Sequence, residues 1–347
     1  FRVECGEMSE DDKAFFKKLW FNGLGEFFYR NGIKTDIGSF VSIDAPEPKN
    51  IPQCEDYVSS GIEIVPVGGG KDSAVTTELL RPFGDKLRFF TVNDQPARTQ
   101  CVLAGGYSED KIIKIYRTID PELLKRNAEG FLNGHTPFSS VVAFISMYAG
   151  FIEGANDVIL SNESSANESN IGGESVNHQY SKSFEFERDF DEFRRRNFPQ
   201  SAVYFSLLRP FCELQIAKQF SQYKQYHPIF RSCNRGSKKN IWCCECPKCL
   251  FVAIMLSPFL PPDELSSIFG CDMLAKTELE TDFDGLCGFT GLKPFECVGT
   301  ADEVVLALTL TAEKYRKSGL EMPALLRRFC EKNTARADYS LLSGFNE

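Results

Sequence analysis

The chain has 347 residues, of which 42% are apolar, and a formal net charge of −9. This length and composition allow one to three globular domains. The acidic balance argues against a dedicated nucleic-acid binder, because neutralising phosphates normally requires a basic excess. The sequence has no signal-peptide pattern and no apolar run of about 18 residues, so we expect a cytoplasmic protein without a membrane span. It begins with Phe1 rather than Met, and we expect a segment before it.

Residues 1–60 are expected to form an N-terminal appendage. Residues 11–31 repeat apolar side chains every three or four positions, which predicts one amphipathic helix ending at Gly32. The following SFVSIDAPEPKNIP, residues 39–52, predicts a strand that runs into a Pro-rich connector.

Strands and helices alternate over the predicted main domain, residues 61–232. The apolar runs are IEIVPV, KLRFFTV, KIIKIY and DVILS, and helices are predicted from Asp72, from about Gln95 and over 137–154. This alternation predicts an α/β domain whose parallel sheet is covered on both faces, with ligands at the carboxyl ends of the strands. Residues 233–347 are expected to form a cysteine-cluster and helical region.

The first strand of that domain ends in a glycine loop, GGGKDS, directly before a helix. Several backbone N–H groups and the positive end of the helix dipole converge there, which predicts an anion site. The spacing differs from both the Walker loop and the dinucleotide fingerprint. The order Gly69-Gly70-x-Asp72-Ser73 resembles the pyrophosphate (PP) loop, Ser-Gly-Gly-x-Asp-Ser, of the N-type ATP pyrophosphatases, with Gly68 in place of the leading Ser.

The PP-loop resemblance implies a fold and a cofactor set. It implies that ATP is cleaved between its α and β phosphates, that Ser73 and the loop amides cradle pyrophosphate, that Asp72 acts through Mg²⁺, and that Lys71 neutralises charge. The end of the next strand, FFTVND, would read adenosine, and LLRPFCELQIAKQF resembles a turn and helix found late in that domain. The expected nucleotide-binding residues are Gly68, Gly69, Gly70, Lys71, Asp72, Ser73, Thr91, Asn93, Asn162 and Asn167.

A cysteine cluster follows in CNRGSKKNIWCCECPKC. Cys233, Cys243, Cys246 and Cys249 have the number and spacing of a closed tetrahedral zinc site, and such four-sulfur sites are usually structural. A similar arrangement occurs in the 7-cyano-7-deazaguanine synthases, where Gly stands at the position of Cys244. Unmetallated core cysteines, an iron–sulfur cluster and sulfur transfer are the alternatives. The remaining cysteines are expected to be buried apolar residues: Cys5, Cys54, Cys101, Cys212, Cys271, Cys287, Cys297 and Cys330.

Residues 160–187, LSNESSANESNIGGESVNHQYSKSFEFE, form a long polar stretch after the fourth predicted strand. A solvated surface loop is one explanation. We predict instead a clamp for substrate and ATP, with Asn162, Glu163 and Asn167 nearest the nucleotide. The candidate proton-transfer residues are His178, Lys182, Glu163 and Glu185. Candidate phosphate or carboxylate contacts, on charge alone, are Arg98, Lys182 and Arg188.

Four strings together resemble one enzyme family. LWFNGLGEFFYRNGI, VGGGKDS, LSNESSANESN and NHQYSKSFEFE are similar to the ATP-dependent epimerases that convert the terminal L-Glu of UDP-N-acetylmuramoyl-L-alanyl-L-glutamate to D-Glu. The resemblance implies a UDP-linked muramoyl dipeptide substrate and a place in peptidoglycan biosynthesis. An acyl-adenylate would make the α-proton acidic, because a free carboxylate next to it opposes a second negative charge. Deprotonation, reprotonation from the other face and hydrolysis would then release AMP.

Three other functions are compatible with the motifs. A ligase like the 7-cyano-7-deazaguanine synthases would adenylate a carboxylate for attack by ammonia, and ammonia dependence would distinguish it. A tRNA-modifying PP-loop enzyme, thiolating or lysidine-forming, fits the acidic balance less well. A non-catalytic nucleotide-binding regulator would bind ATP without forming AMP.

Overall fold

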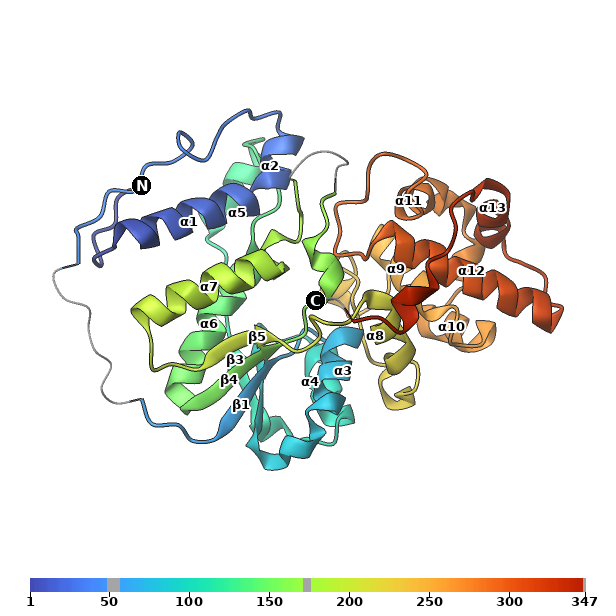
Figure 1. Ribbon diagram of the computed structural model, residues 1–347, viewed down its shortest axis with the longest axis horizontal. Coiled ribbons are helices and arrows are strands. Elements are labelled where there is room, and N and C mark those ends of the chain that lie inside the picture. Colours follow the sequence, from blue (N-terminus) through green and yellow to red (C-terminus); the bar gives the residue numbers. More distant parts are fainter. Residues whose placement is uncertain (49–56, 171–175, 346–347) are drawn as a thin grey trace.

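The structure is a computed structural model that describes residues 1–48, 57–170 and 176–345 (Figure 1). Its strands are β1 (Ile62–Pro66), β2 (Leu87–Val92), β3 (Ile112–Ile115), β4 (Ala155–Leu160) and β5 (Val203–Ser206). They form a parallel sheet in the order β3-β2-β1-β4-β5. The predicted α/β architecture with a parallel sheet is therefore confirmed. The four-residue β5 was not predicted.

The α-helices of the described chain alternate with the strands and then continue alone. They are α1 (Glu10–Gly23), α2 (Gly25–Arg30), α3 (Lys71–Leu79), α4 (Pro96–Ala104), α5 (Pro121–Ala128), α6 (Phe138–Glu153), α7 (Phe184–Asn197), α8 (Glu213–Phe220), α9 (Pro247–Leu256), α10 (Pro262–Phe269), α11 (Glu280–Leu286), α12 (Ala301–Ser318) and α13 (Ala324–Lys332). None of the helices in these described segments is long and apolar enough to cross a membrane.

Successive strand side chains enter two separate cores. Ile64 and Phe90 face one core, whereas their neighbours Val65 and Phe89 face the other, because side chains along a strand alternate between its faces. The first core is closed by α1, α6 and α7, and the second by α3 and α4.

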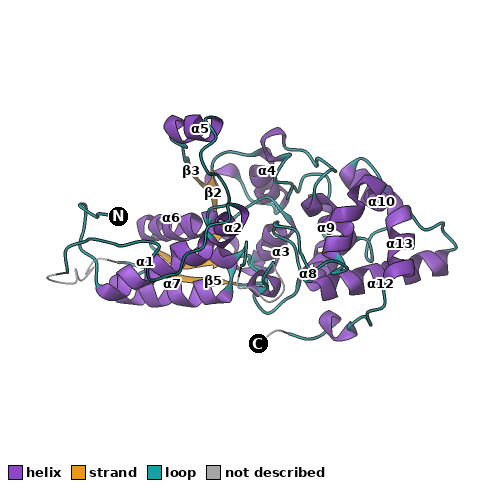
Figure 2. Cartoon of the chain, turned by 90° about the horizontal axis from the view of Figure 1, so that it is seen from above, coloured by secondary structure: helices purple, strands orange, loops and turns teal. Residues whose placement is uncertain are grey.

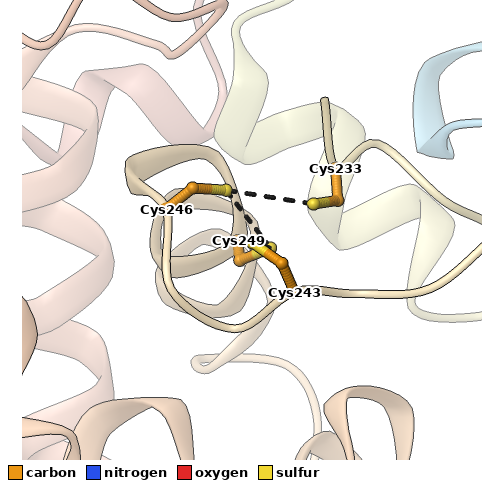
Figure 3. A group of neighbouring side chains, drawn as sticks. All are labelled: Cys233, Cys243, Cys246 and Cys249. Carbon is orange, nitrogen blue, oxygen red and sulfur yellow. Dashed lines mark hydrogen bonds between the residues drawn. The ribbon is translucent and has the colours of Figure 1, made fainter. Parts of the chain in front are cut away.

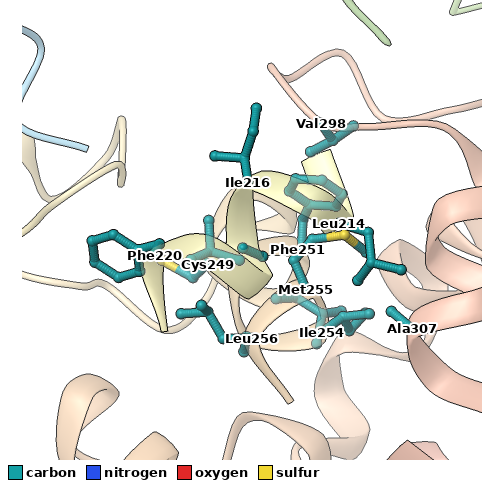
Figure 4. Close-up of a cluster of buried hydrophobic side chains, with 14 of the residues drawn as sticks. Leu214, Ile216, Phe220, Cys249, Phe251, Ile254, Met255, Leu256, Val298 and Ala307 are labelled. Atoms are coloured by element: carbon teal, nitrogen blue, oxygen red, sulfur yellow. The ribbon is translucent and has the colours of Figure 1, made fainter. Parts of the chain in front are cut away.

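The second core continues without a break into the C-terminal helices. Every residue of α9 is buried, and the helix is surrounded by α8, α11 and α12 (Figure 4). A helix that is apolar all round requires such a central position. Figure 2 shows the C-terminal helices at the end of the molecule opposite α1, α6 and α7. Because the core is shared, the boundaries at residues 60 and 232 stay predictions.

The N-terminal segment differs from its prediction in two ways. The single helix predicted over 11–31 is two helices that break at Leu24. At Gly23 a Cβ would lie 2.6 Å from the Pro137 side chain, so the missing side chain permits close packing there. Phe15 of α1 stacks on Phe193 of α7 with ring centroids 4.8 Å apart, which makes α1 part of the layer over the sheet rather than a loose appendage.

The strand predicted at the start of residues 39–52, ahead of the Pro-rich connector, is not formed in its described part. Residues 39–48 contain only an isolated bridge between Asp44 and Arg2, and residues 49–52 lie outside the described chain. Paired main-chain groups, not β-propensity alone, make a strand, and a single bridge leaves the segment without a ladder.

Candidate active site

A cavity of about 440 Å³ lies at the carboxyl ends of β1 and β4. Gly68 and Gly70 line it from the segment after β1, and Ser161 and Asn162 line it from the segment after β4. The chain reverses its direction of winding between these two neighbouring strands, since β2 and β3 lie on one side of β1 and β4 and β5 on the other. Ligands of open parallel sheets bind at such a switch point.

The glycine loop presents an open helix N-terminus to this cavity. Gly70 is the N-cap of α3 and makes no side-chain capping bond, so the first N–H groups of the helix are available to an anion. Gly69 has φ +83°, and a Cβ on Gly70 would lie 2.7 Å from Ser232 Oγ. A Cβ on Gly68 would meet nothing within 4 Å. Gly69 is therefore required by its backbone conformation, a side chain at Gly70 would have to displace the Ser232 hydroxyl, and Gly68 has room for a serine.

Asp72 and Ser73 line the cavity, as predicted for a phosphate site, but Lys71 does not. Lys71 is buried and its ammonium contacts the carboxylates of Asp72 and Glu213. Burial by itself lowers the pKa of Lys71, and the two carboxylates outweigh it and raise that pKa. Lys71 thus holds Asp72 at the edge of the cavity instead of facing a ligand directly.

The charge of the cavity wall is opposite to that of the whole chain. In the described segments its acidic lining residue is Asp72, and its cationic lining residues are Arg98, Lys182, Arg231 and Lys248. Arg98 Nη1 donates to the Asn93 carbonyl at 3.1 Å, and its Nε is buried without a partner in the described chain. Several cations around one helix N-terminus suit a polyphosphate or a carboxylate. Arg188, by contrast, is exposed beside Asp189.

The predicted adenosine and clamp residues lie at different places. Asn162 faces the cavity and donates to Ser206 Oγ at 3.0 Å. Thr91 is buried and Asn93 accepts from the Arg117 N–H at 2.7 Å; both are at the end of β2, outside the cavity wall. Asn167 is exposed and accepts from the Phe184 N–H at 2.8 Å, so it supports the start of α7.

Among the predicted bases, the two glutamates do not reach the cavity wall. Glu163 is buried and caps a short helix, accepting from Ser165 Oγ at 2.7 Å and from the Ala166 N–H at 3.1 Å. Glu185 is half exposed on α7 and pairs with Lys18 at 2.7 Å. Because neither carboxylate lines the cavity, their positions indicate structural roles rather than proton transfer.

Lys182 and His178 do lie together, and they meet a residue that the sequence did not single out. Lys182 Nζ donates to Cys297 Sγ at 3.2 Å, and both residues line the cavity. His178 and the same sulfur affect each other electrostatically, which raises the pKa of His178 and lowers that of Cys297. Lys248 of α9 donates to the Cys297 carbonyl oxygen. The prediction that Cys297 is a buried apolar residue is wrong, because its sulfur is surrounded by cations at a cavity wall.

A carboxylate from the N-terminal segment stands behind this group. Glu26 of α2 contacts His178 Nδ1, and the His135 ring lies 4.0 Å from the His178 ring. Burial by itself lowers the pKa of His178, but Cys297 and Glu26 outweigh it and raise that pKa to about 9. Burial and the nearby charge of His178 lower the pKa of His135 to about 4. Glu26, His135 and His178 could also hold a metal, but the bond of His178 to Glu26 and its contact with Cys297 fit proton positioning.

Glu26, His135 and Cys297 were therefore missed by sequence reasoning. Glu26 lies inside LWFNGLGEFFYRNGI, one of the strings that carry the family resemblance, so that string held the signal. Cys297 is one of thirteen cysteines and belongs to no spaced motif, so the sequence did not single it out. The prediction for single cysteines is also wrong for Cys5 and Cys330, which are exposed, whereas Cys54 lies outside the described residues.

The predicted metal-binding cysteines converge (Figure 3). The sulfurs of Cys233, Cys243, Cys246 and Cys249 lie within 4.8 Å of one another, with 3.5 Å between Cys246 and Cys249 and 4.0 Å between Cys233 and Cys246. A tetrahedral zinc with Zn–S bonds of about 2.3 Å places its sulfurs about 3.8 Å apart, so the group fits a zinc ion.

Cys244 stays outside the cluster. Its thiol donates to the Phe269 carbonyl at 3.2 Å, and its φ is +56°, a left-handed conformation that glycine adopts most easily. The extra thiol is therefore not a fifth ligand. The four other thiols would fill all four positions of a tetrahedral zinc, and such closed sites are usually structural.

Comparisons with known proteins match nearly the whole chain. The family model described as the MurL N-terminal domain matches residues 1–207, and the one described as the MurL C-terminal domain matches residues 229–340. The chain belongs to the MurL family.

Three MurL relatives carry the same name, UDP-N-acetyl-alpha-D-muramoyl-L-alanyl-L-glutamate epimerase. The protein from Xanthomonas oryzae pv. oryzae is 34% identical over 90% of this chain and 70% of its own length. The protein from a Micromonospora species is 35% identical over 88% and 69%, and that from Salinispora tropica is 34% identical over 87% and 66%. The resemblance drawn from the four sequence strings is thereby confirmed at the level of the family.

Proposed function

We propose that this chain is an ATP-dependent epimerase that converts the terminal L-Glu of UDP-N-acetylmuramoyl-L-alanyl-L-glutamate to D-Glu in peptidoglycan biosynthesis. The supporting observation is the pairing of an uncapped helix N-terminus with a cation-lined cavity, in a chain whose relatives carry that epimerase's name. The cavity of about 440 Å³ suits the reacting end of the dipeptide and part of a nucleotide. The UDP-sugar would lie outside it.

The first half of the reaction is activation of the substrate carboxylate. Its oxygen attacks the α phosphate of ATP, which gives an acyl-adenylate and pyrophosphate. The N–H groups at the start of α3 and the Ser73 hydroxyl would hold the departing pyrophosphate. Arg98 and Arg231 line the cavity and would offset its charge. Fixed donors aimed at a leaving group lower the barrier without having to reorganise.

Two metals are part of the proposal. Mg²⁺ would be held by Asp72 and phosphate oxygens, and it would neutralise charge on the phosphates during transfer. A zinc ion held by Cys233, Cys243, Cys246 and Cys249 would stabilise the fold. We place the activity in the cytoplasm, where ATP is available and thiols stay reduced. The assignment of the chain to the PP-loop superfamily is part of this proposal.

The second half of the reaction changes the configuration at the α-carbon. Once the carboxylate is esterified to AMP, removal of the α-proton gives an enolate instead of a dianion, and the enolate can take a proton on the other face. Hydrolysis then releases AMP. Lys182 lines the cavity and donates to Cys297, and this pair supports the proposal that the proton transfer occurs at this wall.

The test is an analysis of products. The chain is incubated with ATP, Mg²⁺ and UDP-N-acetylmuramoyl-L-alanyl-L-glutamate, and we expect AMP, pyrophosphate and a D-Glu product in equal amounts. The same incubation in deuterated water should place deuterium at the α-carbon. Formation of ADP and phosphate would refute the mechanism, and ammonia-dependent AMP release with a heterocyclic carboxylate would favour the ligase. The matched control variant is Ser73→Ala, which should lower AMP formation by about 10²-fold.

A further inference from the structure

The wall of the cavity carries a thiol that none of the comparisons assigns. Cys297 lies in the loop before α12, and Lys182 Nζ donates a hydrogen bond to its sulfur at 3.2 Å. His178, whose Nδ1 contacts Glu26, lies near enough to lower the pKa of this thiol, and Lys248 donates to the Cys297 backbone carbonyl. The sulfur thus has a cationic setting and an open side toward the cavity.

The other ionisable groups of the cavity wall are unsuited to accept a proton. Lys182 already carries one, because the sulfur beside it raises its pKa. Arg98 and Arg231 are cations, and Asp72 lies on the glycine loop, where the phosphates are expected. Cys233 belongs to the metal cluster, 4.0 Å from Cys246. Among the lining residues this leaves Cys297 as a proton acceptor.

We propose that the thiolate of Cys297 removes the α-proton of the activated glutamyl residue, an inference that rests on the proposed epimerase function. The Cα–H bond breaks, an S–H bond forms, and the bonding pair moves into the acyl-adenylate carbonyl as an enolate. The enolate takes one proton from solvent at its opposite face, and the thiol returns its proton to solvent, so the proton count is unchanged. Water then hydrolyses the acyl-adenylate and releases AMP.

Lys182 and His178 act on the sulfur rather than on the substrate. Burial by itself raises the pKa of Cys297, but Lys182, His178 and Lys248 lower it to about 5. The neighbouring Glu296 is the acidic group on the same loop, and its own pKa is raised by burial. Lys182 and His178 are therefore positioning residues that keep the sulfur ionised near neutral pH.

The deuterium experiment separates this proposal from the proposed function. Cys297→Ser is compared with the parent protein for two readouts: substrate-dependent ATP–pyrophosphate exchange and deuterium incorporation at the α-carbon, starting from either diastereomer. We expect incorporation to fall by about 10²- to 10⁴-fold with at least one diastereomer, while ATP–pyrophosphate exchange stays within tenfold. Incorporation within fivefold of the parent with both diastereomers would overturn the role of Cys297. Failure of the parent to exchange pyrophosphate would instead reject the epimerase function.

A chemical readout does not depend on turnover. At pH 6 a thiol of ordinary pKa is about 0.3% ionised, whereas one of pKa near 5 is about 90% ionised. The more acidic thiolate is also the weaker nucleophile, so its net advantage in alkylation rate is about tenfold. Iodoacetamide at pH 6 should thus label Cys297 about tenfold faster than a short cysteine-containing model peptide of ordinary thiol pKa in the same solution, measured by peptide mass spectrometry. Lys182→Met should move the labelling profile of Cys297 to higher pH, and Cys330→Ser should leave pyrophosphate exchange unchanged. Equal labelling of Cys297 and the model peptide at pH 6 would contradict the proposal.

Discussion

Replacing Lys71 with Met should destabilise the fold, and the loss should grow with pH. Lys71 is 1% exposed and contacts the carboxylates of Asp72 and Glu213. Met keeps an apolar stem of similar reach but removes the charge, which leaves the buried Glu213 without a counter-ion. Removing one partner of a buried ion pair typically costs about 3–5 kcal/mol. We expect a loss of that size in the free energy of unfolding at pH 8.

The sign of the pH dependence follows from Glu213. Burial raises its pKa to about 7, although Lys71 lowers it. An acid whose pKa is higher in the folded state stabilises the fold in its protonated form. This contribution to stability is complete below the unfolded pKa of about 4.3 and is lost as the pH rises through the folded pKa. At pH 5, Glu213 is protonated in parent and variant alike, so the loss caused by Lys71→Met should shrink to about 1–2 kcal/mol.

Urea denaturation at pH 5 and pH 8, followed by the fluorescence of Trp20 and Trp242, measures both losses. The matched control is Lys71→Met with Glu213→Gln, because a neutral amide needs no counter-ion. The double variant should recover most of the loss at pH 8 and little at pH 5. A loss for Lys71→Met below about 1 kcal/mol at pH 8, or equal at both pH values, would refute the ion-pair reasoning.

Three further outcomes follow from the site. Gly68→Ser should keep AMP formation within a few-fold of the parent, since a Cβ there meets nothing within 4 Å. Gly69→Ala should lower it by about 10²-fold, because its φ is +83° and a Cβ would lie 3.0 Å from the Ala97 backbone. Equal activity of the two variants would contradict the loop geometry. Cys246→Ser should lower zinc content and soluble yield together, while Cys244→Ser keeps the metal, as elemental analysis can check. Glu185→Gln should leave deuterium incorporation unchanged, and a loss of about 10²-fold would restore it as a base.

Local patterns were sufficient for four of the five strands and for the two motifs with dense spacing. The glycine loop and the four clustered cysteines each lie within a short segment, so their geometry follows from neighbours along the chain. The parallel sheet followed from apolar runs such as IEIVPV. The break at Leu24 could not be read from periodicity, because it depends on how closely Gly23 approaches Pro137, a residue far away in the sequence.

The group of Glu26, His178, Lys182 and Cys297 could not be predicted from local patterns. Its members come from α2, from the polar stretch after β4 and from the loop before α12, and no spacing rule relates Glu26, His178 and Cys297. A cysteine reveals its chemistry through the charges around it, and Lys182 is 115 residues away from Cys297 in the chain. Glu185, in contrast, was selected for its polar neighbourhood in sequence, although α7 points it toward Lys18.

The shared core that joins the sheet to the C-terminal helices also orders the events of synthesis. The glycine loop is complete once Ser73 has been synthesised. Lys71 of that loop has no Glu213 partner until residue 213 has been made, and the cavity wall is incomplete until Cys297 has been made. About 220 residues separate the loop from that thiol, and at 5–20 residues per second the ribosome needs about 10–45 s to make them. A growing chain would therefore carry its glycine loop well before the cavity wall that includes Cys297 exists, with the Lys71 ammonium still unpaired from Glu213.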